Sequence, residues 1–101
     1  MSPSLKTKIE TNKARIAVIG LGYVGLPLAI SFAQKGFKVF GLDKDLDRVS
    51  KIRRKESYIL DVANKDLRRA VNNKSLTAGT DFSILQTVDV IIICVPTPLK
   101  R

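Results

Sequence analysis

Three glycines near the start of the chain have a spacing that suits phosphate binding. Gly20, Gly22 and Gly25 form the pattern G-x-G-x-x-G directly after the apolar run of residues 15–19. In such a turn the first glycine lets the chain leave a strand sharply and the second lets backbone N–H groups approach a pyrophosphate. The third lets the next helix pack close to the sheet, and the free N–H groups at its start attract phosphate. A tight strand–helix turn with small-residue packing is the alternative explanation.

An acidic side chain ends the next apolar run. Asp43 follows residues 38–42 and lies 18 residues after Gly25. A carboxylate at this position accepts hydrogen bonds from the adenosine ribose of a dinucleotide. It also repels a 2′-phosphate, which favours NAD over NADP. Lys44 and Arg48 weaken that preference, because either side chain can reach a phosphate, and a solvated carboxylate at a strand end is the alternative interpretation.

Further candidates lie at the end of the last apolar run. Pro96 and Thr97 follow it at the carboxyl end of the expected sheet, where ligands bind in such folds, so we expect both to line the cofactor site. A rigid turn with Thr97 as a local cap is the alternative. Cys94 lies within the apolar run and the chain has no histidine to activate it, which indicates a buried structural thiol. We assign no catalytic residue and no metal site to this chain.

The segments that must position these residues alternate between strands and helices. Such alternation predicts an α/β fold, and right-handed crossovers give a partial Rossmann, or doubly wound, parallel sheet of order 3-2-1-4 with helices on both faces. Residues 1–13 are polar and aperiodic, which indicates a flexible arm or a short helix. The Val/Ile-rich run predicts a strand buried on both faces. The expected strands are residues 15–19, 38–42, 76–80 and 88–95, and the expected helical segments begin near Val24, Asp45, Asn64 and Asp81.

Composition argues against several classes of partner. The net charge is +9, from 18 basic and 9 acidic residues, but the basic residues are scattered and the densest cluster, at 51–55, contains no aromatic residue. Solvated helix faces explain this pattern better than nucleic-acid binding. The single cysteine excludes an internal disulfide and favours a reducing, cytoplasmic compartment. The longest apolar run, residues 90–95, is far shorter than the roughly 20 residues that cross a membrane.

The run I-A-V-I-G-L-G-Y-V-G-L-P-L-A at residues 16–29 resembles the N-terminus of the UDP-glucose/GDP-mannose dehydrogenase family. Ser57-Tyr58-Ile59, Leu76-Thr77 and Thr80-Asp81-Phe82 extend the resemblance over nearly the whole chain from Arg15 onward. The ending C-V-P-T-P-L is most similar to the branch that acts on UDP-N-acetylhexosamines. In one departure, Lys55 stands where the family usually has a glycine, two residues before the Ser-Tyr-Ile element.

The resemblance implies an NAD-dependent enzyme of polysaccharide biosynthesis that oxidises the C6 alcohol of a UDP-sugar to a carboxylate in two steps with two NAD. Residues 14–101 then form the N-terminal part of an NAD-binding domain. The family's catalytic residues lie beyond Arg101, so we expect the chain alone to be inactive. The cofactor-binding residues that the resemblance carries over are Gly20, Gly22, Tyr23, Val24 and Gly25 at the pyrophosphate, Asp43 at the ribose, and Pro96 and Thr97 along the site.

Two other functions remain open at this point, together with the oligomeric state. A stand-alone dinucleotide-sensing regulatory module is disfavoured by the V-P-T-P exit and the G-Y-V-G turn, and an NADP-dependent reductase is disfavoured by Asp43. In a complete domain a fifth strand would pair with residues 88–95, and these 101 residues contain none. An unpaired strand edge is a template for another chain. We therefore expect a homo-oligomer.

Overall fold

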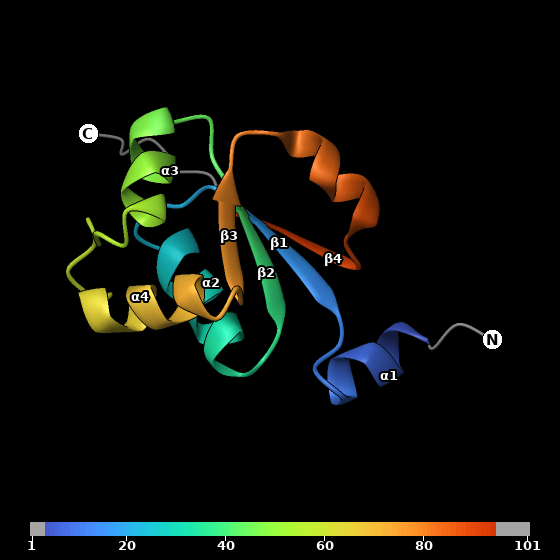
Figure 1. Cartoon of the computed structure of the whole chain (residues 1–101). Helices are drawn as coiled ribbons and strands as arrows, with labels where there is room; N and C mark the ends of the chain where they lie inside the picture. The colour runs from blue at the N-terminus through green and yellow to red at the C-terminus, as the bar shows by residue number, and fades with distance from the viewer. Residues whose placement is uncertain (1–3, 95–101) are drawn as a thin grey trace, which may run out of the picture.

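A computed structural model describes residues 4–94, which form one four-stranded sheet and its connecting helices (Figure 1). The strand order is β3-β2-β1-β4 and every neighbouring pair is parallel, which confirms the predicted fold class. In chain order the elements are α1 Leu5–Glu10, β1 Arg15–Ile19, α2 Gly25–Gln34, β2 Lys38–Leu42, α3 Leu46–Arg53, α4 Asn64–Asn72, β3 Leu76–Gly79, the 3-10 helix η1 Phe82–Thr87 and β4 Val90–Ile93.

Local signals set the ends of the first elements. Pro27 lies in the first turn of α2, where its missing N–H leaves no helical hydrogen bond unmade. Gly36 follows that helix with a φ of 97°, a left-handed conformation that glycine adopts without strain. The carboxylate of Asp45 caps α3 by accepting hydrogen bonds from the N–H groups of Asp47 and Arg48. These elements therefore begin and end close to where the sequence predicts.

The hydrophobic core lies on one face of the sheet. Alternate strand residues such as Ile16, Val18 and Val39 point to this face and are almost completely buried. Helices α2, α3 and α4 cover it with their apolar sides, through residues that include Leu26, Ile52 and Leu67. In Figure 1 all three helices lie together on the left of the strands. This packing fixes the carboxyl ends of β1 and β2, where the glycine turn and Asp43 lie.

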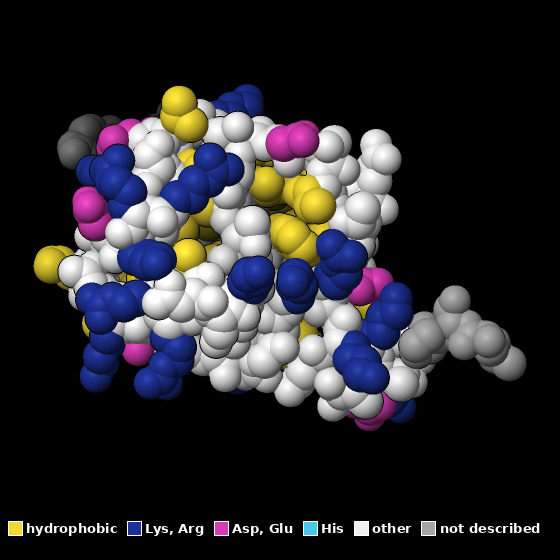
Figure 2. Space-filling view, in the orientation of Figure 1, with side chains coloured by type: hydrophobic (Ala, Val, Ile, Leu, Met, Phe, Trp, Pro, Cys, Tyr) yellow, Lys and Arg dark blue, Asp and Glu magenta, His cyan; other side chains and the backbone are white. Residues whose placement is uncertain are grey.

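The opposite face is only partly covered within residues 4–94. The 3-10 helix η1 lies over it, with Ile84 beside Phe40 of β2. Figure 2 shows apolar side chains still visible in a hollow on this face, with basic side chains spread around it. The prediction that the last strand is buried on both faces is wrong here. Ile91 and Ile93 are 48% and 65% exposed, because no described helix covers their side of β4.

The N-terminal segment contains a short helix, which was one of the two alternatives open for residues 1–13. Ser4 caps α1 by accepting a hydrogen bond from the Thr7 N–H. The ammonium of Lys8 lies 2.8 Å from a carboxylate oxygen of Asp89, and the other oxygen of Asp89 accepts a hydrogen bond from the Arg15 N–H. These contacts attach α1 at the start of β1, at the end of the sheet opposite the glycine turn.

Candidate functional site

Two of the three glycines in the turn are required by the fold itself. Gly20 leaves β1 with a φ of 94°, and its N–H donates to the carbonyl oxygen of Leu42 at 2.8 Å. A side chain at Gly20 would be strained in this left-handed conformation. A Cβ on Gly25 would collide with the carbonyl group of Gly20, because α2 starts directly against the turn. These positions are therefore glycine for structural reasons.

Gly22 has no such structural requirement. The atoms nearest to a Cβ at this position belong to the end of the Arg48 side chain, with Nη1 at 3.7 Å, which is an ordinary van der Waals contact. Gly22 does not have a positive φ. The described residues would thus accommodate an alanine here. A glycine at an open position next to a helix start indicates that something outside the chain approaches the backbone closely.

The start of α2 presents unpaired donors. Within residues 4–94, no acceptor is recorded for the N–H groups of Gly22, Tyr23, Val24 and Gly25. Val24 is the N-cap residue and provides no side-chain hydrogen bond to the helix. The side chains of Tyr23 and Val24 are 85% and 68% exposed, so these two residues contribute to the turn through their backbone. Free N–H groups and the positive end of the helix dipole together form an anion-binding site.

Asp43 lies beside this turn, buried at the carboxyl end of β2. One carboxylate oxygen, Oδ2, accepts hydrogen bonds from the Leu21 N–H at 2.8 Å and from Arg48 Nη1 at 3.1 Å. The other, Oδ1, accepts from the Asp45 N–H at 2.9 Å. A carboxylate has about four acceptor positions, so these bonds leave about one of them free. Asp43 thus joins the glycine turn to the start of α3.

Burial by itself raises the pKa of Asp43, but the hydrogen bonds from Leu21, Asp45 and Arg48 outweigh it and hold the pKa below its usual range. Hydrogen bonding to Asp43 in turn raises the pKa of the Arg48 guanidinium. Both groups are charged at neutral pH. The site therefore carries a negative charge at the end of β2 and a positive charge beside Gly22.

The structure brings six of the eight predicted cofactor residues together at the carboxyl ends of β1 and β2. Pro96 and Thr97 lie outside the described residues. Cys94, interpreted from the sequence as a buried thiol, is half-buried and packs against the core. Sequence reasoning gave no role to Tyr58, whose hydroxyl donates to the carbonyl oxygen of Leu21 at 2.6 Å. From the sequence, Arg48 is only a basic residue that weakens the preference for NAD, and its pairing with Asp43 was not predicted.

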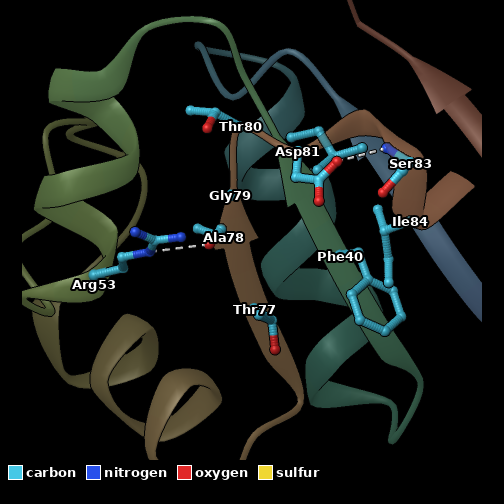
Figure 3. Close-up of a pocket in the computed structure, with 10 residues that line it drawn as sticks. Phe40, Arg53, Thr77, Ala78, Gly79, Thr80, Asp81, Ser83 and Ile84 are labelled. Carbon is cyan, nitrogen blue, oxygen red and sulfur yellow. Dashed lines mark hydrogen bonds between the residues drawn. The ribbon is translucent and has the colours of Figure 1, made fainter.

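A separate hollow of about 270 Å³ lies on the partly covered face of the sheet (Figure 3). Phe40, Thr77 and Ile84 line it, and the side chain of Arg53 closes one side by donating to the carbonyl oxygen of Ala78. None of the glycine-turn residues lines it, and Asp43 does not line it either. Its walls are mainly apolar. We therefore place the candidate site at the turn and not in this hollow.

Two other kinds of site are absent from residues 4–94. No group of histidine, cysteine, aspartate or glutamate side chains there is arranged to hold a metal ion. None of the helices in this range is long and apolar enough to cross a membrane.

Comparison with known proteins decides the family. Residues 14–101 match the NAD-binding domain of the UDP-glucose/GDP-mannose dehydrogenase family. The chain belongs to this family. The match begins one residue before β1 and includes the glycine turn and Asp43. The cofactor of this chain is therefore NAD, as the glycine turn and Asp43 predict.

Named relatives in the family agree with the branch that the sequence resembles. A UDP-N-acetyl-D-mannosamine dehydrogenase of Methanocaldococcus jannaschii is 42% identical over 98 residues, which cover 91% of this chain and 22% of that protein. The protein CapL of Staphylococcus aureus is 38% identical, over 85% of this chain and 19% of that protein. The chain thus spans about a fifth of the length of these family members.

Solved structures of the family share the fold. A UDP-D-ManNAc dehydrogenase from Pyrococcus horikoshii superimposes with a TM-score of 0.79 at 38% identity, over 85% of this chain and 21% of that one. A ternary complex of GDP-mannose dehydrogenase from Pseudomonas aeruginosa has a TM-score of 0.80 at 32% identity, over 86% of this chain and 20% of that one. The NAD-binding fold of the family is therefore present in this chain.

Proposed function

We propose that this chain binds NAD with the pyrophosphate on the N–H groups of Gly22 to Gly25 and the adenosine ribose on Asp43. The observation that carries this proposal is Gly22, the one glycine of the turn that the fold does not require. Gly22 has an open position and the first of the four N–H groups that lack an acceptor among residues 4–94, which leaves room for a phosphate against the backbone. Pro96 and Thr97 are assigned to the same site by family resemblance alone.

Arg48 has a second part in this proposal. Its guanidinium pairs with Asp43 and lies beside Gly22. Two ribose hydroxyls need more acceptor positions than Asp43 has free, so ribose binding displaces Arg48 from the carboxylate. The displaced guanidinium then lies next to the pyrophosphate, where it neutralises charge. Arg48 thereby favours the diphosphate, while Asp43 disfavours a phosphate on the ribose.

For the whole protein we propose a nucleotide-sugar 6-dehydrogenase that oxidises the C6 alcohol of a UDP-N-acetylhexosamine to a carboxylate with two NAD. The names of the relatives support this substrate class. Bound NAD would accept the hydride, and residues 14–101 bind and orient the NAD. No residue of this chain is assigned to proton transfer or covalent catalysis, so the 101 residues alone are expected to oxidise no UDP-sugar.

The substitution Gly22→Ala tests the cofactor site directly. The added methyl group has room in the ligand-free chain, so thermal stability is expected to stay within a few degrees of the unchanged chain. The methyl group occupies the space of the pyrophosphate, so NAD affinity measured by calorimetric titration is expected to fall at least about tenfold.

Gly25→Ala is the contrasting variant, because its methyl group collides with the Gly20 carbonyl and is expected to lower stability itself. A Gly22→Ala chain that binds NAD as tightly as the unchanged chain would show that the turn is only a structural corner.

A further inference from the structure

The peptide groups on both sides of Leu21 are held by side chains from other parts of the chain. The Leu21 N–H donates to Asp43, and the Leu21 carbonyl oxygen accepts from the hydroxyl of Tyr58 at 2.6 Å. The side chain of Leu21 is fully buried against Gly41, where a Cβ would lie 3.0 Å from Leu21 Cδ2. Leu21 is therefore immobilised from three directions, just before the unpaired N–H groups of the turn.

The contact with Tyr58 also sets the direction of the next N–H group. The carbonyl of Leu21 and the N–H of Gly22 belong to one planar peptide unit, and in a trans peptide they point in opposite directions. Because the carbonyl points at Tyr58, the Gly22 N–H points away from it. That N–H is the first of the four without an acceptor among residues 4–94.

The position of Tyr58 allows its hydroxyl to hold the Leu21 carbonyl permanently. It lies in the loop between α3 and α4, 37 residues from Leu21 in sequence, and its ring packs against the hydrophobic core. Burial raises the pKa of its phenol above the ordinary value, and the nearby charge of Arg48 opposes this only in part. The hydroxyl therefore remains protonated, and remains a donor, throughout the neutral range.

We propose that Tyr58 is a positioning residue of the cofactor site, which holds the Leu21–Gly22 peptide so that the Gly22 N–H faces the pyrophosphate. The proposal rests on the proposed NAD site. It adds that the loop at residues 55–62, which supplies none of the residues assigned to the cofactor, contributes to cofactor affinity. A donor that is already oriented does not lose conformational freedom on binding, which is the physical origin of the gain.

The test uses Tyr58→Phe, which keeps the packed ring and removes only the donor. Affinities of the 101-residue chain for NAD, ADP-ribose and adenosine are measured by calorimetry and by titration of amide resonances. Loss of one such hydrogen bond is expected to weaken NAD and ADP-ribose about fivefold. Adenosine has no phosphate and is expected to change less than about twofold, because Asp43 is untouched. Leu60→Ala, a fully exposed residue of the same loop, is the matched control and is expected to change none of the three.

A second readout needs no ligand. In Tyr58→Phe the amide resonance of Gly22 is expected to shift, because its peptide is no longer held, while amides in β3 and α4 stay in place. Equal weakening of all three ligands would indicate a general loosening and overturn the proposal, and so would an unshifted Gly22 resonance or an unchanged NAD affinity. If the unchanged chain binds no NAD, the proposed NAD site is contradicted, while the Gly22 resonance still decides whether Tyr58 positions the peptide.

Discussion

Asp43 has a structural role in the described chain and, in the proposed NAD site, a binding role as well. It joins the glycine turn to the start of α3 through the N–H groups of Leu21 and Asp45, and it pairs with Arg48. Removal of the whole side chain would therefore disturb the turn as well as the ribose contact. An amide of the same shape keeps the packing and one acceptor oxygen and loses the charge, but its NH2 group replaces one of the two oxygens that accept from the backbone N–H groups.

Cofactor choice is the first consequence of that charge. We expect the unchanged chain to bind NAD more tightly than NADP, because the Asp43 carboxylate repels a 2′-phosphate. Asp43→Asn is expected to weaken NAD about tenfold, since hydrogen bonds to a charged acceptor are the stronger ones, and to narrow the gap to NADP. Calorimetric titration with both cofactors measures this. Equal or tighter binding of NADP by the unchanged chain would contradict the assignment.

Acid sensitivity is the second consequence. The pKa of Asp43 in the folded chain lies below its ordinary value of 3.8, so the unfolded chain binds the proton more readily. The stabilisation is present above that value and is lost as the pH falls through the folded pKa. We therefore expect the difference in unfolding free energy between the unchanged chain and Asp43→Asn to be larger near pH 7 than near pH 3, by urea unfolding at about these two values.

The carboxylates of Asp81 and Asp89 also have lowered pKa values, the first through hydrogen bonding to Ser83 and the second through the Arg15 N–H. Asp81 and Asp89 are the same in the unchanged chain and in Asp43→Asn, so their contributions cancel in the difference in unfolding free energy. If the difference in unfolding free energy between the two chains does not change with pH, Asp43 stabilises the chain by its shape and not by its charge.

Among the elements, the loop that carries Tyr58 begins with a strained residue. Lys55, the position where the family usually has glycine, has a φ of 65°, which is the left-handed region. The sequence departs from the family pattern here, but the backbone keeps the conformation that a glycine would favour. The side chain of Lys55 therefore costs stability without changing the course of the loop.

Lys55→Gly is accordingly expected to raise the free energy of unfolding by about 0.5–1 kcal/mol, the left-handed penalty less the extra chain entropy of glycine. Lys55→Ala removes the same charged side chain but keeps the Cβ, and is expected to bring no comparable gain. Chemical denaturation of both variants makes the comparison. If alanine stabilises as much as glycine, the effect comes from charge and not from backbone strain.

Most of the elements that carry the site can be predicted from the sequence, because their signals are local. The ends of β1 and β2 follow from apolar runs that stop at Gly20 and Asp43, and the Asp45 cap marks α3. The role of Tyr58 gave no such signal, since its partner Leu21 is 37 residues away and the hydrogen bond forms only after the loop packs on the core. The exposure of Ile93 was missed because an apolar run does not tell which face lacks a covering helix.

At the scale of the whole molecule, an apolar strand forms one edge of the described sheet. On one side β4 pairs with β1, and no described strand lies on its other side. Ile91 and Ile93 are exposed on the face that η1 covers only in part. Unpaired backbone groups and exposed isoleucines both favour contact with another chain. The 101-residue chain is therefore expected to self-associate, most simply as a two-fold dimer.

Light scattering at tens of micromolar measures this association against the monomer mass of 11.2 kDa. Ile93→Lys places a charge on the exposed edge and is expected to shift the chain toward the monomer. Leu60→Lys adds the same charge at a fully exposed residue of the loop between α3 and α4, outside the sheet, and is expected to leave the mass unchanged. A clean monomer for the unchanged chain would overturn the expectation of a dimer.

The central claim is that the turn from Gly20 to Gly25, together with Asp43, binds NAD. A crystal structure of this chain with NAD tests it most directly. We expect pyrophosphate oxygens at about 2.7–3.2 Å from N–H groups of the turn, and ribose hydroxyls at a similar distance from the Asp43 carboxylate. Arg48 is expected to have moved from Asp43 toward the phosphates. A nucleotide bound in the hollow beside Phe40 and Ile84, with the turn N–H groups still unoccupied, would contradict the account.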